Sequence, residues 1–142
     1  MKTFPLAKVQ AIRQIEMDQA KNELLMIRQS IQEVLQTIEQ LELKQNALLD
    51  DRNRKLTEGT KPFDLHQDPV IIKALTELKK THQNKLLELR HIEDKSLKVL
   101  LEKKQTVNGL DKLKDKFIAN QALEQRKQEA DFVESTLVHK YR

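Results

Sequence analysis

The sequence has no cysteine and no tryptophan, and it contains only 2 glycines, 3 prolines and 4% aromatic residues. Without cysteine it can form neither a disulfide framework nor a thiolate metal site, which fits a reducing compartment. A globular α/β domain of 142 residues would normally carry more aromatic residues and many more glycines. The scarcity of glycine also excludes a glycine-rich phosphate-binding loop.

Long hydrophobic runs are missing as well. No stretch of about 18 apolar residues occurs, so we expect no membrane-spanning helix. The first residues hold no apolar core of signal-peptide length, because Lys8 and Arg13 interrupt them. We therefore expect no secretion signal.

The titratable residues form no pattern typical of catalysis or metal binding. The histidines are dispersed, and none belongs to a His-Glu-x-x-His motif. Asp64, His66 and Asp68 fit a solvated polar loop better than a metal site. Catalysis needs groups fixed in a water-excluding site, whereas the carboxylates here fall on outer helix faces. We predict no catalytic residues, no cofactor, no metal and no enzyme activity.

The sequence does contain apolar residues at coiled-coil spacing. Steps of three and four residues separate the members of one run, as in the seam of a left-handed coiled coil. The predicted seam of the first helix is Leu24, Ile27, Ile31, Val34, Ile38, Leu41, Gln45 and Leu48. Upstream, Val9, Ile12 and Ile15 follow at steps of three before Met17 and Ala20. That irregularity predicts a local skip in the heptads near Arg13 to Glu16.

The strongest break in helical pattern lies between Gly59 and Pro69. Gly59 suits a helix end, and Asp68 followed by Pro69 suits the start of the next helix. We predict a first helix over about 5–57, a loop over about 58–68 and a second helix over about 69–139.

The second helix has a broader apolar stripe. Its predicted seam is Ile71, Leu75, Leu78, His82, Leu86 and Leu89, then Leu100, Lys103, Val107, Leu110, Lys114 and Phe117. The two runs require a register change between Leu89 and Ser96. Asn108-Gly109 is a turn signal. Because apolar spacing continues through it, we favour a continuous helix with an interior glycine costing about 1 kcal/mol, and a bend is the alternative.

Neither helix can bury its stripe alone, so the two must fold back on each other. The sequence predicts an all-α fold, a single long antiparallel two-helix coiled-coil hairpin in one domain over 1–142. A fold-back with Leu48 near Leu78 sets Leu6 near Gln121, and Gly109 opposite Met17 or Asp18. Residues 122–142 then overhang as a single helix. With one seam per helix, we expect a monomer in isolation.

The net charge of +4 is uneven. Its basic excess belongs to the second helix and is densest from Lys95 to Lys116. Such a stripe suits an acidic protein groove, or is simply a solvated face. Because few arginines and no aromatic series accompany it, we expect no nucleic-acid binding.

Both ends of the chain carry family-like patterns. The first is Phe4-x-Leu6-x-Lys8-Val9-x-x-Ile12-Arg13, and the second is Glu124-x-Arg126-Lys127-Gln128-Glu129-x-Asp131-Phe132. They resemble the ends of the type III export stalk family, the FliJ/YscO-like proteins of flagellar and virulence secretion systems. The resemblance covers the whole chain. The second helix lacks the tryptophan of some flagellar members, so the flagellar and virulence assignments both stay open.

The resemblance implies a non-enzymatic central stalk, similar to the γ subunit of rotary ATPases. Such a stalk inserts in the pore of a hexameric export ATPase and links it to the export gate, with secretion chaperones as further candidate partners. It implies a cytoplasmic protein, peripheral to the inner membrane. Candidate ATPase contacts are Phe4, Arg13, Lys114, Lys116, Phe117, Arg126, Lys127 and Phe132. Candidate export-gate contacts are Ile71, Leu75, Leu78 and His82.

Two other functions stay open at this stage. A generic coiled-coil scaffold would self-associate through the overhang and the lysine stripe. A helical-hairpin chaperone or cofactor would hold unfolded clients or secretion chaperones. Binding to a hexameric ATPase would discriminate the stalk from both. The residues do not indicate whether a stalk would rotate.

Overall fold

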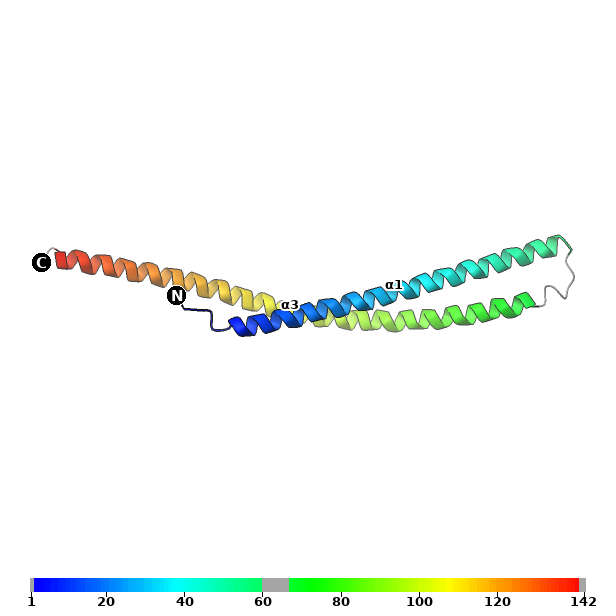
Figure 1. Ribbon diagram of the computed structural model, residues 1–142, viewed down its shortest axis with the longest axis horizontal. Coiled ribbons are helices and arrows are strands. Elements are labelled where there is room, and N and C mark those ends of the chain that lie inside the picture. The colour runs from blue at the N-terminus through cyan, green and yellow to red at the C-terminus, as the bar shows by residue number, and fades with distance from the viewer. Residues whose placement is uncertain (1, 60–66, 141–142) are drawn as a thin grey trace. The chain divides into compact units, whose positions relative to one another are not determined.

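A computed structural model describes residues 2–59 and 67–140 of the chain, and the side chains of 2–59 and 69–139. It contains two α-helices, α1 (Ala7–Thr57) and α3 (Gln67–Lys140), and no strand within these residues. The helices run antiparallel and pack against each other (Figure 1). The predicted all-α helical hairpin is confirmed. The loop residues 60–66, with Asp64 and His66, lie outside the described residues.

The helix ends follow the local sequence. Pro5 lies in a turn before α1, where the Ala7 N–H donates to the Phe4 carbonyl at 3.1 Å. Gly59 follows α1 with a φ of 75°, a left-handed conformation that glycine adopts without steric cost. The expected helix-ending role of Gly59 is thus confirmed. The second helix, α3, begins at Gln67, slightly before the expected Pro69.

The chain packs as two compact units. One comprises residues 22–98, and the other comprises 1–21 together with 99–142. Both helices contribute to each unit. The continuous assignment of α3 through Asn108 and Gly109 confirms the favoured reading of that dipeptide as helix interior.

In the unit of residues 22–98, α1 supplies the buried seam. Apolar side chains at alternating steps of three and four pack toward α3 and are almost sealed from water. They are Leu24, Ile31, Val34, Ile38 and Leu41, and the half-buried Ile27 completes the spacing between the first two. Gln45 and Leu48 continue the series as half-buried positions, so the predicted seam of the first helix is confirmed.

The facing side of α3 is only half-buried and more polar than predicted. Its inner positions in this unit are Ile72, Leu75, Lys79, His82, Leu86, Leu89, Glu93 and Ser96. Their spacing is regular from Leu86 to Ser96, so the predicted register change is wrong. The predicted seam did not include Glu93 and Ser96, because neither residue is apolar. Ile71 and Leu78, which were predicted in the seam, lie on its exposed flank.

Polar contacts fix the pairing of the two helices in this unit. Gln45 Nε2 donates to Thr76 Oγ1 at 2.6 Å, and the Glu42 carboxylate lies 3.0 Å from Lys79 Nζ. Further along, Arg28 Nε lies 3.3 Å from the Glu93 carboxylate. Each step back along α1 is matched by an equal step forward along α3. Leu48 therefore pairs near Lys73 rather than near Leu78, and the predicted pairing was several residues off.

In the second unit, residues 2–21 pack on α3 from Val99 onward. Its buried centre is formed by Met17, Ala20 and Val107. Gln10 Nε2 donates to Asp111 Oδ1 at 2.6 Å, which places Gly109 near Ile12 instead of Met17. The expected opposition of Gly109 to Met17 or Asp18 is therefore also wrong.

The predicted skip in the first heptads is wrong as well. The half-buried Gln10 lies one heptad before the buried Met17, and Arg13 between them is exposed, so the heptads continue without a skip. Val9, Ile12 and Ile15 are all exposed, so they do not form the seam. Apolar spacing did not identify the buried side of α1 in this segment, because the side that faces α3 is polar and the apolar residues lie on an outer side.

Candidate functional site

An aromatic contact joins the N-terminal segment to α3. The rings of Phe4 and Phe117 lie with centroids 5.5 Å apart and planes tilted by 52°. That geometry is among those favoured by aromatic pairs. Both residues are half-buried, and both were predicted ATPase contacts, so the structure brings two of these candidates together.

A small hollow of about 260 Å³ surrounds this aromatic pair. It is lined by Lys2, Phe4, Lys114, Phe117, Ile118, Gln121, Ala122 and Gln125. The lining combines apolar surface with two lysines. Such a lining suits an apolar side chain that is accompanied by negative charge.

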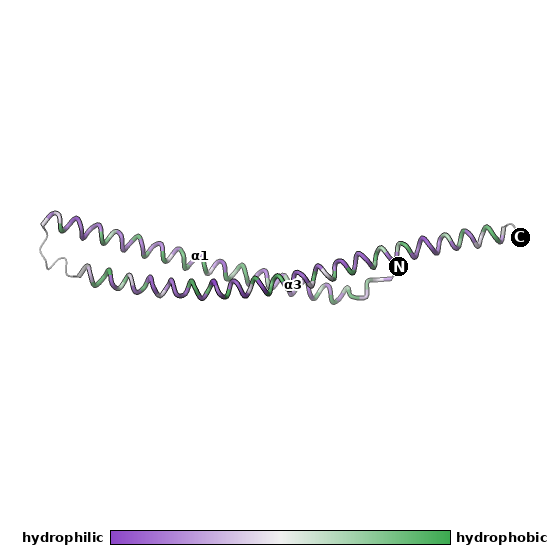
Figure 2. Tube along the Cα trace, turned by 180° about the vertical axis from the view of Figure 1, so that it is seen from behind, coloured by the Kyte–Doolittle hydropathy of each residue, from purple (hydrophilic) through white to green (hydrophobic). Residues whose placement is uncertain are grey.

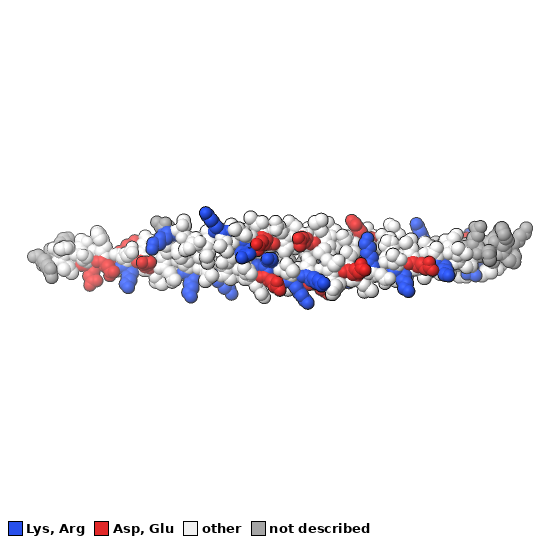
Figure 3. Space-filling model, turned by 90° about the horizontal axis from the view of Figure 1, so that it is seen from below, with Lys and Arg blue, Asp and Glu red and all other residues white. Residues whose placement is uncertain are grey.

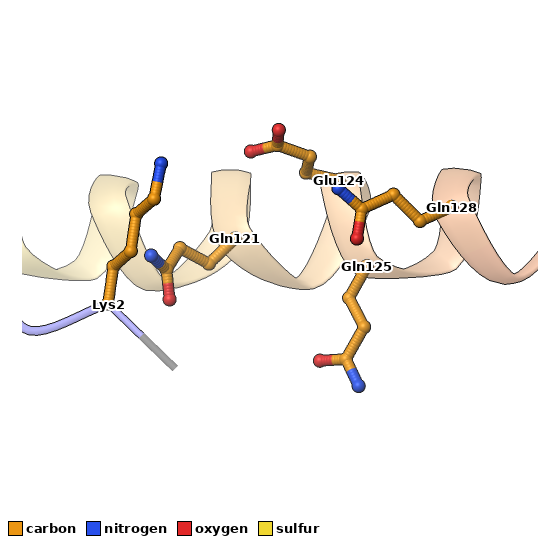
Figure 4. Close-up of a pocket in the computed structure, with 5 residues that line it drawn as sticks. All are labelled: Lys2, Gln121, Glu124, Gln125 and Gln128. Atoms are coloured by element: carbon orange, nitrogen blue, oxygen red, sulfur yellow. The ribbon is translucent and has the colours of Figure 1, made fainter.

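A second, more polar hollow adjoins it. Figure 4 shows Lys2 of the N-terminal segment extending beside Gln121 of α3, with Glu124, Gln125 and Gln128 following along the helix. None of these groups is arranged with a nucleophile and a base in contact. The hollow can offer hydrogen bonds to a protein surface, and nothing in its lining is typical of a catalytic site.

Glu16 links two basic residues within this unit. Its carboxylate lies 3.0 Å from Arg13 Nη1 and 3.3 Å from Lys103 Nζ. The hydrogen bonds from Arg13 and then Lys103 hold the pKa of Glu16 below its usual range, because they favour the charged form. Arg13, a predicted ATPase contact, therefore already forms an ion pair with another residue of the same chain, although its side chain remains 44% exposed.

The remaining ATPase candidates are exposed side chains of α3. Lys114 lines the hollow around Phe4 and Phe117, and the exposed Lys116 directly precedes Phe117 in α3. Arg126, Lys127 and Phe132 lie beyond Gln121, where every residue from 122 to 139 is exposed, Phe132 by 70%. The structure therefore gathers Phe4, Phe117 and Lys114 in one hollow. Arg126, Lys127 and Phe132 lie instead on a part of α3 in which every side chain is exposed.

The four export-gate candidates do not form one surface. Leu75 and His82 are half-buried at inner positions facing α1, whereas Ile71 and Leu78 are exposed on the flank. His82 Nδ1 is buried with no hydrogen-bond partner within the described part of the chain. Only Ile71 and Leu78 are available to an external partner in this arrangement.

The sequence interpretation missed five residues of the aromatic hollow, namely Lys2, Ile118, Gln121, Ala122 and Gln125. Ile118 offered a usable signal, because it is an apolar residue directly beside the seam residue Phe117 and is 55% exposed. Lys2 and Gln121 offered none, since their role depends on how the N-terminal segment pairs with α3.

Neither α1 nor α3 holds a segment apolar enough to cross a membrane in the portions that the structure covers. Over 2–59 and 67–140, histidines and carboxylates form no cluster suited to a metal ion.

The fold and these surfaces define a helical-hairpin protein whose exposed features suit contacts with other proteins. The family model described as flagellar FliJ protein matches residues 1–133, and the chain belongs to that family. It is therefore a protein related to flagellar type III export, and the family is a non-catalytic component of the export apparatus. Neither the curated proteins nor the solved structures contain a significant match.

Proposed function

We propose that this protein is the non-enzymatic central stalk and adaptor of a hexameric export ATPase. In this role it inserts in the hexamer pore and links the ATPase to the export gate, with secretion chaperones as further partners. It acts in the cytoplasm at the inner-membrane face of the export apparatus. Membership of the FliJ family supports an export role, and the rest of the proposal depends on the surfaces described above.

The observation that carries the proposal is the gathering of aromatic and basic groups in one unit. All eight ATPase candidates lie within residues 1–21 and 99–142. The hollow around Phe4 and Phe117 provides an apolar anchor point, and Lys2 and Lys114 in its lining add positive charge. Aromatic anchors supply most of the residence time of an interface, whereas charges at its rim steer association.

The export-gate contact has narrower support. It depends on Ile71 and Leu78, which lie seven residues apart on one exposed flank of α3. Residues at this spacing present one face to a groove of a partner. The inner residues Leu75 and His82 would act by holding α3 in place.

ATP turnover by the cognate hexamer, with and without this chain across a salt series, tests the stalk function. We expect stimulation by the wild-type chain. Reversing Arg126 and Lys127 to Glu together should weaken stimulation, and most at low salt, where screening is least. The matched control reverses Lys98 and Lys112, which are exposed on the outer face of α3.

The two outcomes separate the proposed function from its alternatives. No stimulation by the wild-type chain at any salt concentration would remove the stalk function and favour a generic coiled-coil scaffold. Equal losses of ATPase stimulation in the test and control variants would show that net charge, rather than the Arg126 and Lys127 surface, drives the contact.

A further inference from the structure

The part of α3 beyond Gln121 carries an apolar face of its own. Continued at its own spacing, the hairpin seam would fall on Glu124, Gln128 and Asp131, which are all polar. A different phase, shifted by two residues, contains Leu123, Arg126, Ala130, Val133 and Leu137. We call these five residues the overhang face. A shift of two residues turns about 200° around a helix, so the overhang face points away from the side that packs on the N-terminal segment.

The overhang face is open along its whole length. Each of its five residues is exposed, and Leu123 and Val133 are 62% and 55% exposed. A shallow groove of about 450 Å³ runs along it, lined by Arg126, Glu129, Ala130, Val133, Glu134 and Leu137. Figure 2 shows hydrophobic residues recurring among hydrophilic ones along this part of α3. Apolar residues at heptad spacing on a bare helix are typical of a helix that pairs with another.

The charges beside the overhang face change sign along it. Lys127 lies on one flank, and Glu134 lies on the same flank one heptad later. On the face shown in Figure 3, acidic side chains gather near the C-terminal end of α3, and basic side chains follow toward the N-terminal end of the helix. A helix with opposite charges at the two ends of one flank is complementary to its own reversed copy.

We propose that the overhang face binds the overhang face of a second copy of this chain in antiparallel orientation. Aligning Val133 of one copy with Ala130 of the second puts Lys127 beside the second copy's Glu134. The two-fold symmetry of the pair repeats that contact. Arg126 packs its aliphatic stem beside the second copy's Leu137 and keeps its guanidinium in water. The small Ala130 lets the two helices approach closely at the centre.

The charges favour this antiparallel register over shifted registers and over a parallel pair. A slip by one heptad in either direction brings Lys127 against Lys127, or Glu134 against Glu134. A parallel pair in register stacks Arg126 on its own copy and places Glu129 beside Glu134. Like charges in these positions are destabilising, so of these arrangements only the proposed one pairs opposite charges at both symmetry-related contacts.

The pairing is weak, because it contains few apolar layers and none is large. An interface of this size falls at the low end of specific contacts, and we expect a dissociation constant on the order of 0.1–1 mM. The chain is then a monomer when dilute and pairs when local concentration is high. This inference does not depend on the proposed stalk function, although both involve Arg126 and Lys127.

Sedimentation equilibrium of the full chain, without any ATPase, tests the pairing up to about 1 mM protein at low salt. We expect reversible dimers of the wild type. Lys127→Glu and Glu134→Lys should each weaken association about tenfold, because both flanking pairs become repulsive. An equimolar mixture of the two variants should associate almost as well as wild type, since every contact between unlike copies regains opposite charges.

Lys112→Glu makes the same charge change on the outer face of α3 and should leave association unchanged. All three positions are exposed, so circular dichroism should show unaltered helix content. Single reversals without effect, or a mixture as weak as its components, would overturn the proposed register. A chain that stays monomeric throughout, but loses ATPase stimulation on Val133→Asp, would overturn self-pairing and assign the overhang face to the ATPase.

Discussion

At the scale of single residues, Gly109 is the clearest unfavourable choice in the chain. It lies in the interior of α3. Glycine has more conformations available in the unfolded chain than alanine, so it loses more conformational entropy when the helix forms. A Cβ atom added there would meet no atom within 4 Å. Nothing in the packing of the described residues therefore requires glycine at this position.

We predict that Gly109→Ala stabilises the protein by about 0.5–1 kcal/mol, because it lowers the entropy of the unfolded chain. Thermal or urea unfolding would measure the change. Gly59→Ala is the matched control, since its φ of 75° strains any residue with a Cβ and should make that variant less stable. A loss of stability in Gly109→Ala would indicate that α3 has to bend there.

Seam and flank residues should differ sharply in their effect on stability. Ile31 is 3% exposed, so Ile31→Ala should cost about 2–4 kcal/mol through lost burial and cavity formation. Glu42→Ala breaks an ion pair between the exposed Glu42 and the half-buried Lys79, and should cost less than about 1 kcal/mol. Urea unfolding compares the two, and equal losses would contradict the seam described for α1.

Glu16 predicts an acid-sensitive contribution to stability. Its pKa is lowered in the folded chain, so its contacts with Arg13 and Lys103 stabilise the fold above the ordinary glutamate pKa. This contribution is lost as pH falls through the lowered pKa. Glu16→Gln should therefore be less stable than wild type near neutral pH and equal to it in strong acid. Unfolding measured across that range tests this, and a difference that persists in strong acid would contradict it.

At the scale of elements, the two helices could be predicted because their apolar spacing is long and nearly unbroken. The seam from Leu24 to Leu41 was read correctly because every member is apolar. The errors fell where the inner position is polar, at Gln10, Glu93 and Ser96. A half-buried seam tolerates such residues because long side chains reach water or a partner, as Glu93 does with Arg28.

The pairing of α1 with α3 could not be predicted to the residue. It depends on how the segment between Gly59 and Pro69 turns, and turn signals there do not fix the path. It also depends on contacts such as Gln45 with Thr76, which no periodicity reveals. For the same reason Lys2 and Gln121 could not be predicted to line one hollow, because their proximity follows from that pairing.

The C-terminal part of α3 should be dispensable for the hairpin. Every residue from 129 to 139 is exposed, so a chain that ends at Gln128 should lose helical signal roughly in proportion to the deletion. Its thermal midpoint should change little, because no buried layer is removed. Circular dichroism measures both quantities. A large fall in the midpoint would show that this segment stabilises the rest of the chain.

At the scale of the whole molecule, we predict a monomer at micromolar concentration. Each unit already pairs α1 with α3 along its buried seam, so neither needs a second copy to fold. Light scattering after size exclusion should give a mass near 16.7 kDa. A stable dimer or tetramer in dilute solution would contradict both this prediction and the weak pairing proposed for the overhang face.

The candidate partner contacts could be predicted only as residue types. Aromatic and basic residues near both termini indicated a binding region, and the structure places Phe4 and Phe117 in contact. The groups that would recognise them belong to other proteins. The chain therefore indicates the chemistry of a partner, without the complementary half of the interface.

The thinness of the seam has a consequence for how the protein unfolds. Among the described residues no large side chain is fully sealed from water, and the buried residues follow one another along the helices at heptad spacing. Free energy then accumulates layer by layer, as along a zipper, rather than through one shared core. Heating should separate the helices over a wide temperature interval, and amide hydrogen exchange should be slowest from Leu24 to Leu41 and fastest beyond Gln121.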